Sequence, residues 1–268
     1  MQSKQRKKRI DLNKVIVFLP AFNEEESIGE VIGNIPRSFA GVDQVEVLVI
    51  DDGSTDGTVA EARKAGADHI ISFEKNRGLG AAVREGLDAC YKMGADVGVM
   101  IDADGEYPAW QIPDIVKPII NGETDYTMGS RFMGTIKGMK FHRRMGNYIF
   151  TFLQTLLLRK WLYDGQSGMR AFSRQVLKHA EIIHDYNYAQ VLTLNLVRKG
   201  YRVLEVPIKY RVRTTGTSFI SFKKYMTNVV PAVYREMTRP VIKVSGEEKF
   251  QRKSSKNSDK KVTFIKYD

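Results

Sequence analysis

The sequence predicts an α/β fold with a mostly parallel central sheet flanked by helices. Short, nearly continuous apolar runs alternate with helix-length segments through the first half of the chain, which is typical of parallel strands buried on both faces. Polar motifs directly follow the first, second and fourth runs, at the sheet edge where such folds bind ligands. With 268 residues, 43% of them hydrophobic, the chain can form a large core.

Five strands are expected in the first half, because each is a short apolar run bounded by polar or glycine-containing segments. They cover residues 15–19, 45–50, 69–72, 97–101 and 126–129. The segments between them predict helices at residues 27–35, about 58–65 and 78–91. This alternation of strand and helix indicates parallel pairing with crossover helices.

The pattern changes after about residue 137. Helices are expected at residues 147–159, 175–180 and 188–199, and a strand at residues 201–206. A last helix is expected at residues 219–237, because its apolar residues recur at spacings of three and four and define one face. These apolar positions are 219, 222, 226, 229, 233 and 237.

The net charge of +11 is unevenly distributed. Residues 1–10 carry +5, residues 11–136 carry −12, residues 137–240 carry +14 and residues 241–268 carry +4. We therefore expect a basic tail at 1–12, one domain at 13–240 and a polar, mobile tail at 241–268. Within the domain, the acidic half (about 13–136) suits a nucleotide and metal site, and the basic half (about 137–240) suits an acceptor phosphate or an anionic lipid surface.

The composition excludes several classes of protein. A single cysteine, Cys90, cannot form an internal disulfide and indicates a reducing compartment. Residues 1–9 lack the apolar stretch of a signal peptide, so none is expected, and the longest apolar stretch, residues 148–158, is too short to cross a bilayer. That stretch predicts a helix in a membrane interface, in the core or between subunits. We expect no nucleic-acid partner, since the acidic half would repel a polyanion, and a non-catalytic nucleic-acid-binding protein is only a remote alternative.

The motif DADGE places Asp102 and Asp104 where a strand gives way to a loop. Two carboxylates at this spacing can converge on one hard cation, and Glu106 can supply a third oxygen. Mg²⁺ and Mn²⁺ prefer such ligands. The alternative is an ordinary solvated acidic loop.

Two further motifs combine helix starts with side chains suited to a nucleoside. PAFNEEE carries Phe22 and Glu24, and DDGSTDGT begins with Asp51 and contains the helix cap Asp56 or Thr58. Capping explains the end of the second motif but not its adjacent carboxylates. A third motif, NRGLGAA, is not a dinucleotide fingerprint. Counted from Gly78, the sixth place of the G-x-G-x-x-G pattern is Val83 instead of Gly or Ala, and the motif follows the third strand instead of the first.

Taken together and in order, these motifs resemble family 2 glycosyltransferases of the GT-A fold, and among them the dolichyl-phosphate mannose synthase-like branch of polyprenyl-phosphate glycosyltransferases. The resemblance covers about residues 14–220 and rests on PAFNEEESI, VLVIDDGSTDGT, NRGLGAA, DADGEYP, GSRF, DGQSGMRAF and GYRVLEVPI. It implies inverting transfer of a hexose from a nucleotide-diphosphate sugar of the GDP-mannose or UDP-glucose type. It also implies a divalent cofactor, Mg²⁺ or Mn²⁺.

The resemblance assigns roles to individual residues. The nucleotide sugar would contact Pro20, Phe22, Glu24, Asp51, Asp102, Ala103, Asp104 and Arg213. The metal would be held by Asp102, Asp104 and Glu106, the last where polyprenol-type members often carry Gln. The acceptor phosphate would meet Arg131 and Arg143 or Arg144, and the expected catalytic residues are Asp104, Arg131 and Asp164.

Asp164 separates two hypotheses about the acceptor. A polyprenyl phosphate is already anionic and needs no strong base, so Asp164 would only orient the acceptor site. A saccharide hydroxyl, in glycan or cell-envelope polymer synthesis, needs a carboxylate to take its proton, and Asp164 would be that base. Two departures from the family pattern, Phe219 in place of a lysine and Val191 near the place of a Glu, leave donor and acceptor open.

We therefore expect a cytoplasmic hexosyltransferase with peripheral contact to the cytoplasmic face of a membrane. Its expected partners are a nucleotide-diphosphate sugar and a polyprenyl phosphate. The sequence leaves open whether the chain forms a homo-oligomer.

Overall fold

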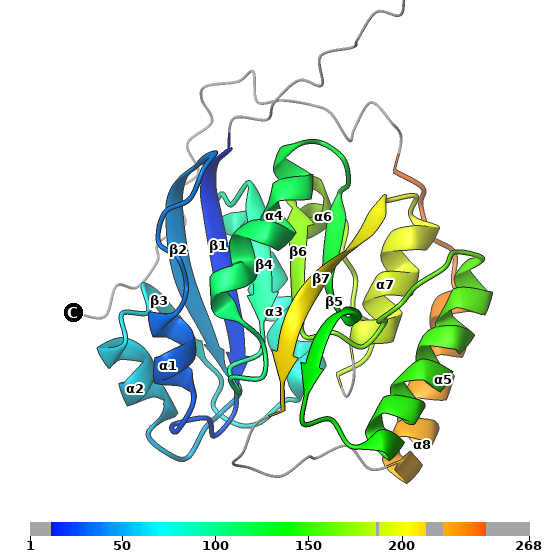
Figure 1. Cartoon of the computed structure of the whole chain (residues 1–268), viewed down its shortest axis with the longest axis horizontal. Coiled ribbons are helices and arrows are strands. Elements are labelled where there is room, and N and C mark those ends of the chain that lie inside the picture. Colours follow the sequence, from blue (N-terminus) through cyan, green and yellow to red (C-terminus); the bar gives the residue numbers. More distant parts are fainter. Residues whose placement is uncertain (1–11, 186–187, 213–221, 245–268) are drawn as a thin grey trace, which may run out of the picture.

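The computed structural model describes residues 12–185, 188–212 and 222–244, and within these ranges seven strands form one sheet in the order β3-β2-β1-β4-β6-β5-β7 (Figure 1). The strands are β1 (Leu12–Ala21), β2 (Val42–Asp51), β3 (His69–Ser72), β4 (Val97–Ile101), β5 (Tyr126–Lys137), β6 (Met169–Ser173) and β7 (Val203–Arg211). The two predicted halves of the chain thus contribute to a single sheet.

The pairing is mostly parallel, as predicted. β1 pairs in parallel with β2 and β4, β2 with β3, and β5 with β7. Strand β6 is antiparallel to both β4 and β5. The carboxyl ends of β1, β2, β4, β5 and β7 therefore meet at one edge of the sheet, and the segment that leads into β6 enters from that same edge.

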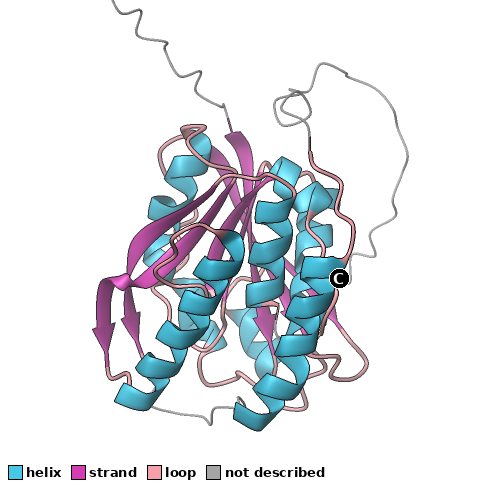
Figure 2. Cartoon of the chain, turned by 90° about the vertical axis from the view of Figure 1, so that its right-hand side faces the viewer, coloured by secondary structure: helices cyan, strands magenta, loops and turns pink. Residues whose placement is uncertain are grey.

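Helices cover both faces of the sheet (Figures 1 and 2). One face packs against α1 (Ile28–Gly33), α2 (Thr58–Lys64), the short 3₁₀ helix η1 (Ala109–Gln111) and α4 (Ile112–Ile120). The other packs against α3 (Leu79–Lys92), α6 (Arg174–His179) and α7 (Ala189–Arg198). Helices α5 (Phe141–Leu158) and α8 (Phe222–Thr238) pack outside α7.

The strands are apolar throughout because both sheet faces are buried. In β1, Val15, Val17 and Leu19 contribute to one core, and the alternate residues Ile16 and Phe18 contribute to the other. All five side chains are fully buried. This alternation is the expected result of strand geometry in a sheet between two helical layers.

Several elements differ from the sequence prediction. Helix α4 was not expected; it holds Pro113 in its first turn, where proline is tolerated, and Pro118 in its interior. Strand β6 was not predicted. It overlaps the end of the motif DGQSGMRAF, for which the sequence analysis considered only Asp164. Strands β5 and β7 extend further along the chain than expected, and α5 begins at Phe141 rather than at residue 147.

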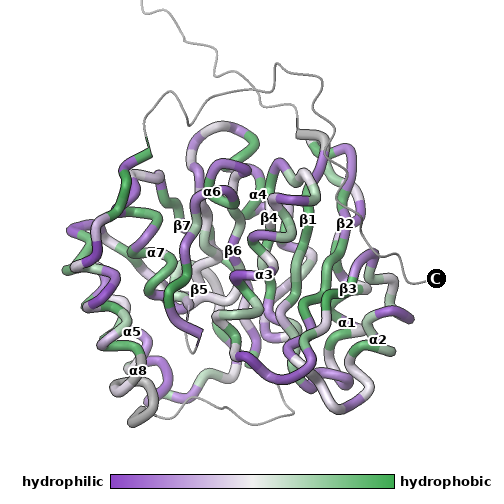
Figure 3. Tube along the Cα trace, turned by 180° about the vertical axis from the view of Figure 1, so that it is seen from behind, coloured by the Kyte–Doolittle hydropathy of each residue, from purple (hydrophilic) through white to green (hydrophobic). Residues whose placement is uncertain are grey.

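Helix α5 presents most of its apolar side chains to solvent. Of its residues only Thr151 and Gln154 are buried, whereas Phe152 is 60% and Leu156 is 66% exposed. Apolar residues run along the central strands and recur along α5 in the hydropathy trace (Figure 3). Of the three alternatives for residues 148–158, the one that places them in the core is therefore wrong for these side chains. No helix among the described residues has the length and apolar character needed to span a bilayer.

Candidate active site

The loops that follow β1, β2 and β4 are joined by hydrogen bonds. The Glu24 backbone N–H donates to Thr58 Oγ1 over 2.8 Å, which ties the loop after β1 to the start of α2. The Ser27 hydroxyl donates to the Ala103 carbonyl over 2.8 Å, which ties the same loop to the DADGE segment. The predicted nucleotide residues Pro20, Phe22, Glu24, Asp51, Asp102, Ala103 and Asp104 are therefore all brought to one edge of the sheet.

The paired carboxylates after β2 hold two turns. Asp51 is buried and accepts the Ser54 N–H over 2.9 Å. Asp52 is also buried and accepts the N–H groups of Arg77 and Gly78 over 2.7 and 2.9 Å, which fixes the loop before α3. Burial raises the pKa of Asp52, although these two hydrogen bonds oppose the shift. Asp52 thus holds the backbone of Arg77 and Gly78 in the NRG motif. The sequence analysis did not assign this role to it.

The three carboxylates of DADGE form a concentration of negative charge. Burial raises the pKa of Asp102 well above its usual value, and the charges of Asp104 and Glu106 raise it further, against the positive charges of Arg170 and Arg131. A divalent cation would relieve this repulsion, and carboxylate oxygens are the ligands that Mg²⁺ and Mn²⁺ prefer. The donor set at Asp102 and Asp104 therefore fits such an ion.

The Glu106 carboxylate is engaged by other side chains. Its carboxylate accepts hydrogen bonds from Arg143 over 3.2 and 3.3 Å and from the Tyr210 hydroxyl. In the described part of the chain, no three His, Cys, Asp or Glu side chains are arranged to hold a metal ion. The predicted third metal ligand is thus engaged by Arg143, because β7 brings Tyr210 and α5 brings Arg143 to the same carboxylate.

Gly168 packs directly against Asp102. A Cβ at Gly168 would overlap the Asp102 carboxylate, and the Gly168 N–H donates to the Tyr107 hydroxyl over 2.8 Å. Tyr107 in turn packs edge-on against Tyr210, with ring centroids 5.3 Å apart. The segment before β6 therefore forms one wall of the carboxylate site. Residue 168 must be glycine because its backbone lies too close to Asp102 for a side chain.

Arg131 and Asp164 form a buried ion pair. Arg131 is 3% exposed and Asp164 is not exposed. Arg131 Nε and Nη2 donate to the two Asp164 carboxylate oxygens over 2.6 and 2.7 Å, and the Arg131 backbone N–H donates to Oδ2 over 3.0 Å. Asp164 therefore lacks a free oxygen for an acceptor hydroxyl, and its predicted role as a base is not supported by this geometry.

A second arginine lies close to this pair. Burial lowers the pKa of Arg143, Tyr210 and Glu106 raise it above its usual value, and the charge of Arg131 works against them. Both guanidinium groups lie beside Tyr210: Arg131 is 5.2 Å from its ring centroid, and Arg143 donates to the same Glu106 carboxylate as its hydroxyl. Arg144 instead lies over the rings of Phe132 and Tyr148, at 6.0 and 5.7 Å from their centroids.

Arg170 is a fully buried cation on β6. It donates to the carbonyl oxygens of Ser167 and Gly165 over 2.7 and 3.1 Å, and to the Ala189 carbonyl of α7 over 3.2 Å. It also donates to the Thr193 hydroxyl over 3.0 Å. Arg170 therefore fastens the segment before β6 to the helix layer behind it.

Some predicted residues lie elsewhere. Arg213 and Phe219 fall outside the described residues. Val191, near the place where many family members carry a Glu, is fully buried in α7. The sequence analysis missed Tyr107, Gly168, Glu205 and Tyr210. Their signal was present in the motifs DADGEYP, DGQSGMRAF and GYRVLEVPI, but only the fold shows which carboxylate each contacts.

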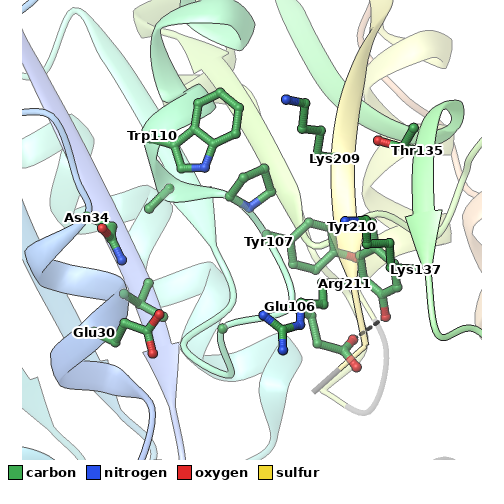
Figure 4. A pocket seen from close by; sticks show the side chains of 14 residues that line it. Glu30, Asn34, Glu106, Tyr107, Trp110, Thr135, Lys137, Lys209, Tyr210 and Arg211 are labelled. Atoms are coloured by element: carbon green, nitrogen blue, oxygen red, sulfur yellow. Dashed lines mark hydrogen bonds between the residues drawn. The ribbon is translucent and has the colours of Figure 1, made fainter. Parts of the chain in front are cut away.

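A cavity of about 310 Å³ adjoins the carboxylates and arginines of the candidate site on the side of α1 (Figure 4). It shares Glu106, Tyr107 and Tyr210 with the site and is otherwise lined from α1, η1 and the ends of β5 and β7. Neither Asp102 nor Asp104 lines it. We therefore place the chemistry at the carboxylates and arginines rather than in this cavity.

Comparison with known proteins agrees with this geometry. The family model described as Glycosyl transferase family 2 matches residues 16–180. The UDP-N-acetylglucosamine–dolichyl-phosphate N-acetylglucosaminyltransferase of Methanococcus voltae is 31% identical over 216 residues, which cover 73% of this chain and 84% of that protein. The polyprenol monophosphomannose synthase of Mycolicibacterium smegmatis is 31% identical over 219 residues, covering 78% and 81%.

A solved structure shows the same architecture. Glucosyl-3-phosphoglycerate synthase from Mycobacterium tuberculosis, crystallised with Mn²⁺, uridine diphosphate and phosphoglyceric acid, superposes with a TM-score of 0.67 at 25% identity. The match covers 85% of this chain and 80% of that one. The predicted GT-A fold is thereby confirmed.

Proposed function

This chain belongs to glycosyl transferase family 2 and is a glycosyltransferase, and we propose that it transfers a hexose from a nucleotide-diphosphate sugar to a polyprenyl phosphate with inversion. The observation that carries the proposed acceptor is the pairing of Arg131 with Asp164 beside Arg143. This arrangement would supply guanidinium N–H donors to an acceptor phosphate, and it occupies both carboxylate oxygens of Asp164, which leaves Asp164 unable to act as a base.

The donor would bind at the joined loops after β1, β2 and β4. Phe22 offers a ring and Asp51 a carboxylate for the nucleoside, and Asp102 with Asp104 would hold a divalent ion on the diphosphate. The remaining ligands of this ion would come from the diphosphate and from water, as is common for Mg²⁺. When bound, it neutralises the charge that develops on the departing nucleoside diphosphate.

The acceptor needs orientation more than activation. A phosphate oxygen is anionic at neutral pH, so it can attack the anomeric carbon while the bond to the nucleoside diphosphate breaks. Arg131 Nη1 has no hydrogen-bond partner among the described residues, and this group, together with Arg143, would hold the acceptor phosphate. One relative is named for dolichyl phosphate and another for the synthesis of polyprenol monophosphomannose, which supports this choice of acceptor.

The exposed face of α5 fits a membrane surface. Phe141, Phe152 and Leu156 of α5, and Trp161 just beyond its end, are each at least 60% exposed. Residues 137–163 contain six Lys or Arg and no Asp or Glu. A bilayer covers apolar side chains and attracts nearby cations by about 1 kcal/mol each. We therefore propose peripheral binding at the cytoplasmic face, where the free Cys90 would stay reduced.

The test of function is a transfer assay. Purified protein with Mg²⁺ or Mn²⁺ is incubated with labelled GDP-mannose, UDP-glucose or UDP-N-acetylglucosamine and a short-chain polyprenyl phosphate. We expect one donor to give a labelled lipid that extracts into organic solvent and that Asp104→Asn abolishes, while the exposed Asp43→Asn leaves it unchanged. Transfer to a saccharide with no lipid product would contradict the proposal.

Membrane binding is tested separately with vesicles. Co-sedimentation should be stronger with phosphatidylglycerol vesicles than with phosphatidylcholine vesicles. Phe152→Glu with Leu156→Glu should abolish it, whereas Ile242→Glu, at an even more exposed apolar residue outside α5, should not. If the double variant converts a dimer to a monomer and vesicle binding is absent in the wild type, α5 is a subunit interface instead.

A further inference from the structure

Arg131 lies where the β5–β7 ladder is interrupted. Ser130 pairs with Pro207 and Thr135 pairs with Lys209, so β5 contains extra residues between two nearby positions of β7. Bulges of this kind re-aim side chains and remove ladder hydrogen bonds. The Arg131 backbone N–H accordingly donates to Asp164 and not to β7. The orientation of Arg131 therefore depends on Asp164.

Asp164 itself belongs to an irregular segment between α5 and β6. Its backbone N–H donates to Glu205 Oε1 over 2.6 Å, and the N–H of the preceding Tyr163 donates to Glu205 Oε2 over 2.8 Å. Both oxygens of one carboxylate thus hold two successive residues of the segment. Because Glu205 is on β7, in register with Met128 of β5, it ties this segment to the sheet.

We propose that Glu205 is a positioning residue for the acceptor: it fixes the backbone of residues 163 and 164, and through Asp164 it aims the Arg131 guanidinium. The inference rests on the proposed acceptor phosphate. Glu205 touches neither donor nor acceptor in this scheme. Its removal should therefore weaken acceptor binding and largely spare the nucleotide site, because the nucleotide loops follow β1, β2 and β4, and Gly168 beside Asp102 is held separately by the Tyr107 hydroxyl.

Glu205→Gln is the sharpest change, because it keeps the size of the side chain. One oxygen can still accept an N–H, but an amide NH₂ group now faces the other donor. We expect the KM for a short-chain polyprenyl phosphate to rise about tenfold, since small displacements of positioning groups have large effects on reacting geometry. The Kd for the nucleoside diphosphate with Mn²⁺ should stay within twofold of wild type. Glu74→Gln, at an exposed carboxylate, is the control.

A double-mutant cycle tests whether Glu205 acts through Arg131. In an Arg131→Lys background, where the two-point contact with Asp164 is lost, Glu205→Gln should add little to the acceptor KM. Effects that multiply independently would overturn the inference, because coupled residues are non-additive. If Glu205→Gln does not fold, Glu205→Asp carries the same measurement, and an unchanged acceptor KM would overturn it.

The outcomes separate the two proposals. A wild-type protein that makes no lipid product refutes the lipid-phosphate function. A wild-type protein that makes the product, with an acceptor KM that Glu205→Gln does not alter, refutes the role of Glu205 alone. An equal loss of donor and acceptor binding would likewise show that Glu205 merely supports the fold.

Discussion

Replacement of Gly168 by Ala should displace the Asp102 carboxylate and impair donor binding. A Cβ at residue 168 would lie 2.5 Å from Asp102 Cγ and 2.9 Å from Oδ1, and closer still to Oδ2. Because non-bonded carbon atoms prefer about 3.5–4.0 Å, the carboxylate must move by about 1 Å. The backbone of Gly168 cannot easily retreat, since its N–H is bonded to Tyr107 and β6 begins at Met169.

The expected magnitude follows from this displacement. A misplacement of about 1 Å costs about 100-fold in rate, which corresponds to about 2.7 kcal/mol of transition-state stabilisation. We expect kcat/KM for the nucleotide sugar to fall by about that factor. Overpacking at the site should cost a further 1–3 kcal/mol, roughly, in the free energy of unfolding.

Calorimetric titration with the nucleoside diphosphate, with and without Mn²⁺, measures the effect directly. The control is Gly33→Ala in α1, where an added Cβ would meet no atom within 4 Å. The control should bind as wild type does. Metal-dependent binding by Gly168→Ala within threefold of wild type would refute both the close contact and the assignment of Asp102 to the metal.

Three other predictions concern stability. Asp164→Asn leaves the buried Arg131 charge without its partner and should lower the free energy of unfolding by about 3–5 kcal/mol in urea; an unchanged midpoint would contradict the pairing. Arg170→Met removes the donor to the Gly165 and Ser167 carbonyls and should cost about 3 kcal/mol or more, so a loss under 1 kcal/mol would count against its fastening role. Burial raises the pKa of Glu181, but the hydrogen bonds and charges of Lys199 and Arg239 lower it by more, so the pKa in the folded chain lies below its usual value. The folded chain then binds fewer protons than the unfolded chain, and the stability from Glu181 is full above its unfolded pKa and lost as pH falls through its folded pKa. Glu181→Gln should therefore lower Tm near pH 7 and lose this effect in acid, and a Tm difference independent of pH would exclude the ion pairs as its cause.

The sequence was informative wherever function depends on neighbouring residues. The apolar runs predicted the parallel strands, and strand polarity then placed Asp51 and Asp102 at the same sheet edge without knowledge of any contact. The pairing Asp102-Ala-Asp104 is local as well, since two carboxylates two residues apart at a strand end converge through the turn between them. Such inferences rest on the geometry of a few consecutive residues.

The partners of the Glu106, Asp164 and Glu205 carboxylates are known only from the tertiary structure. Glu106 follows the DAD motif closely and stays a predicted third ligand, but the fold also brings Tyr210 and Arg143, far along the chain, to its carboxylate. For Asp164 the sequence left a base and an orienting group open, and Arg131 on a bulged strand takes both of its oxygens. A carboxylate acts as ligand, base or anchor according to which donor the fold brings to it. Those donors are 30 or more residues away in sequence, so no local pattern could identify them.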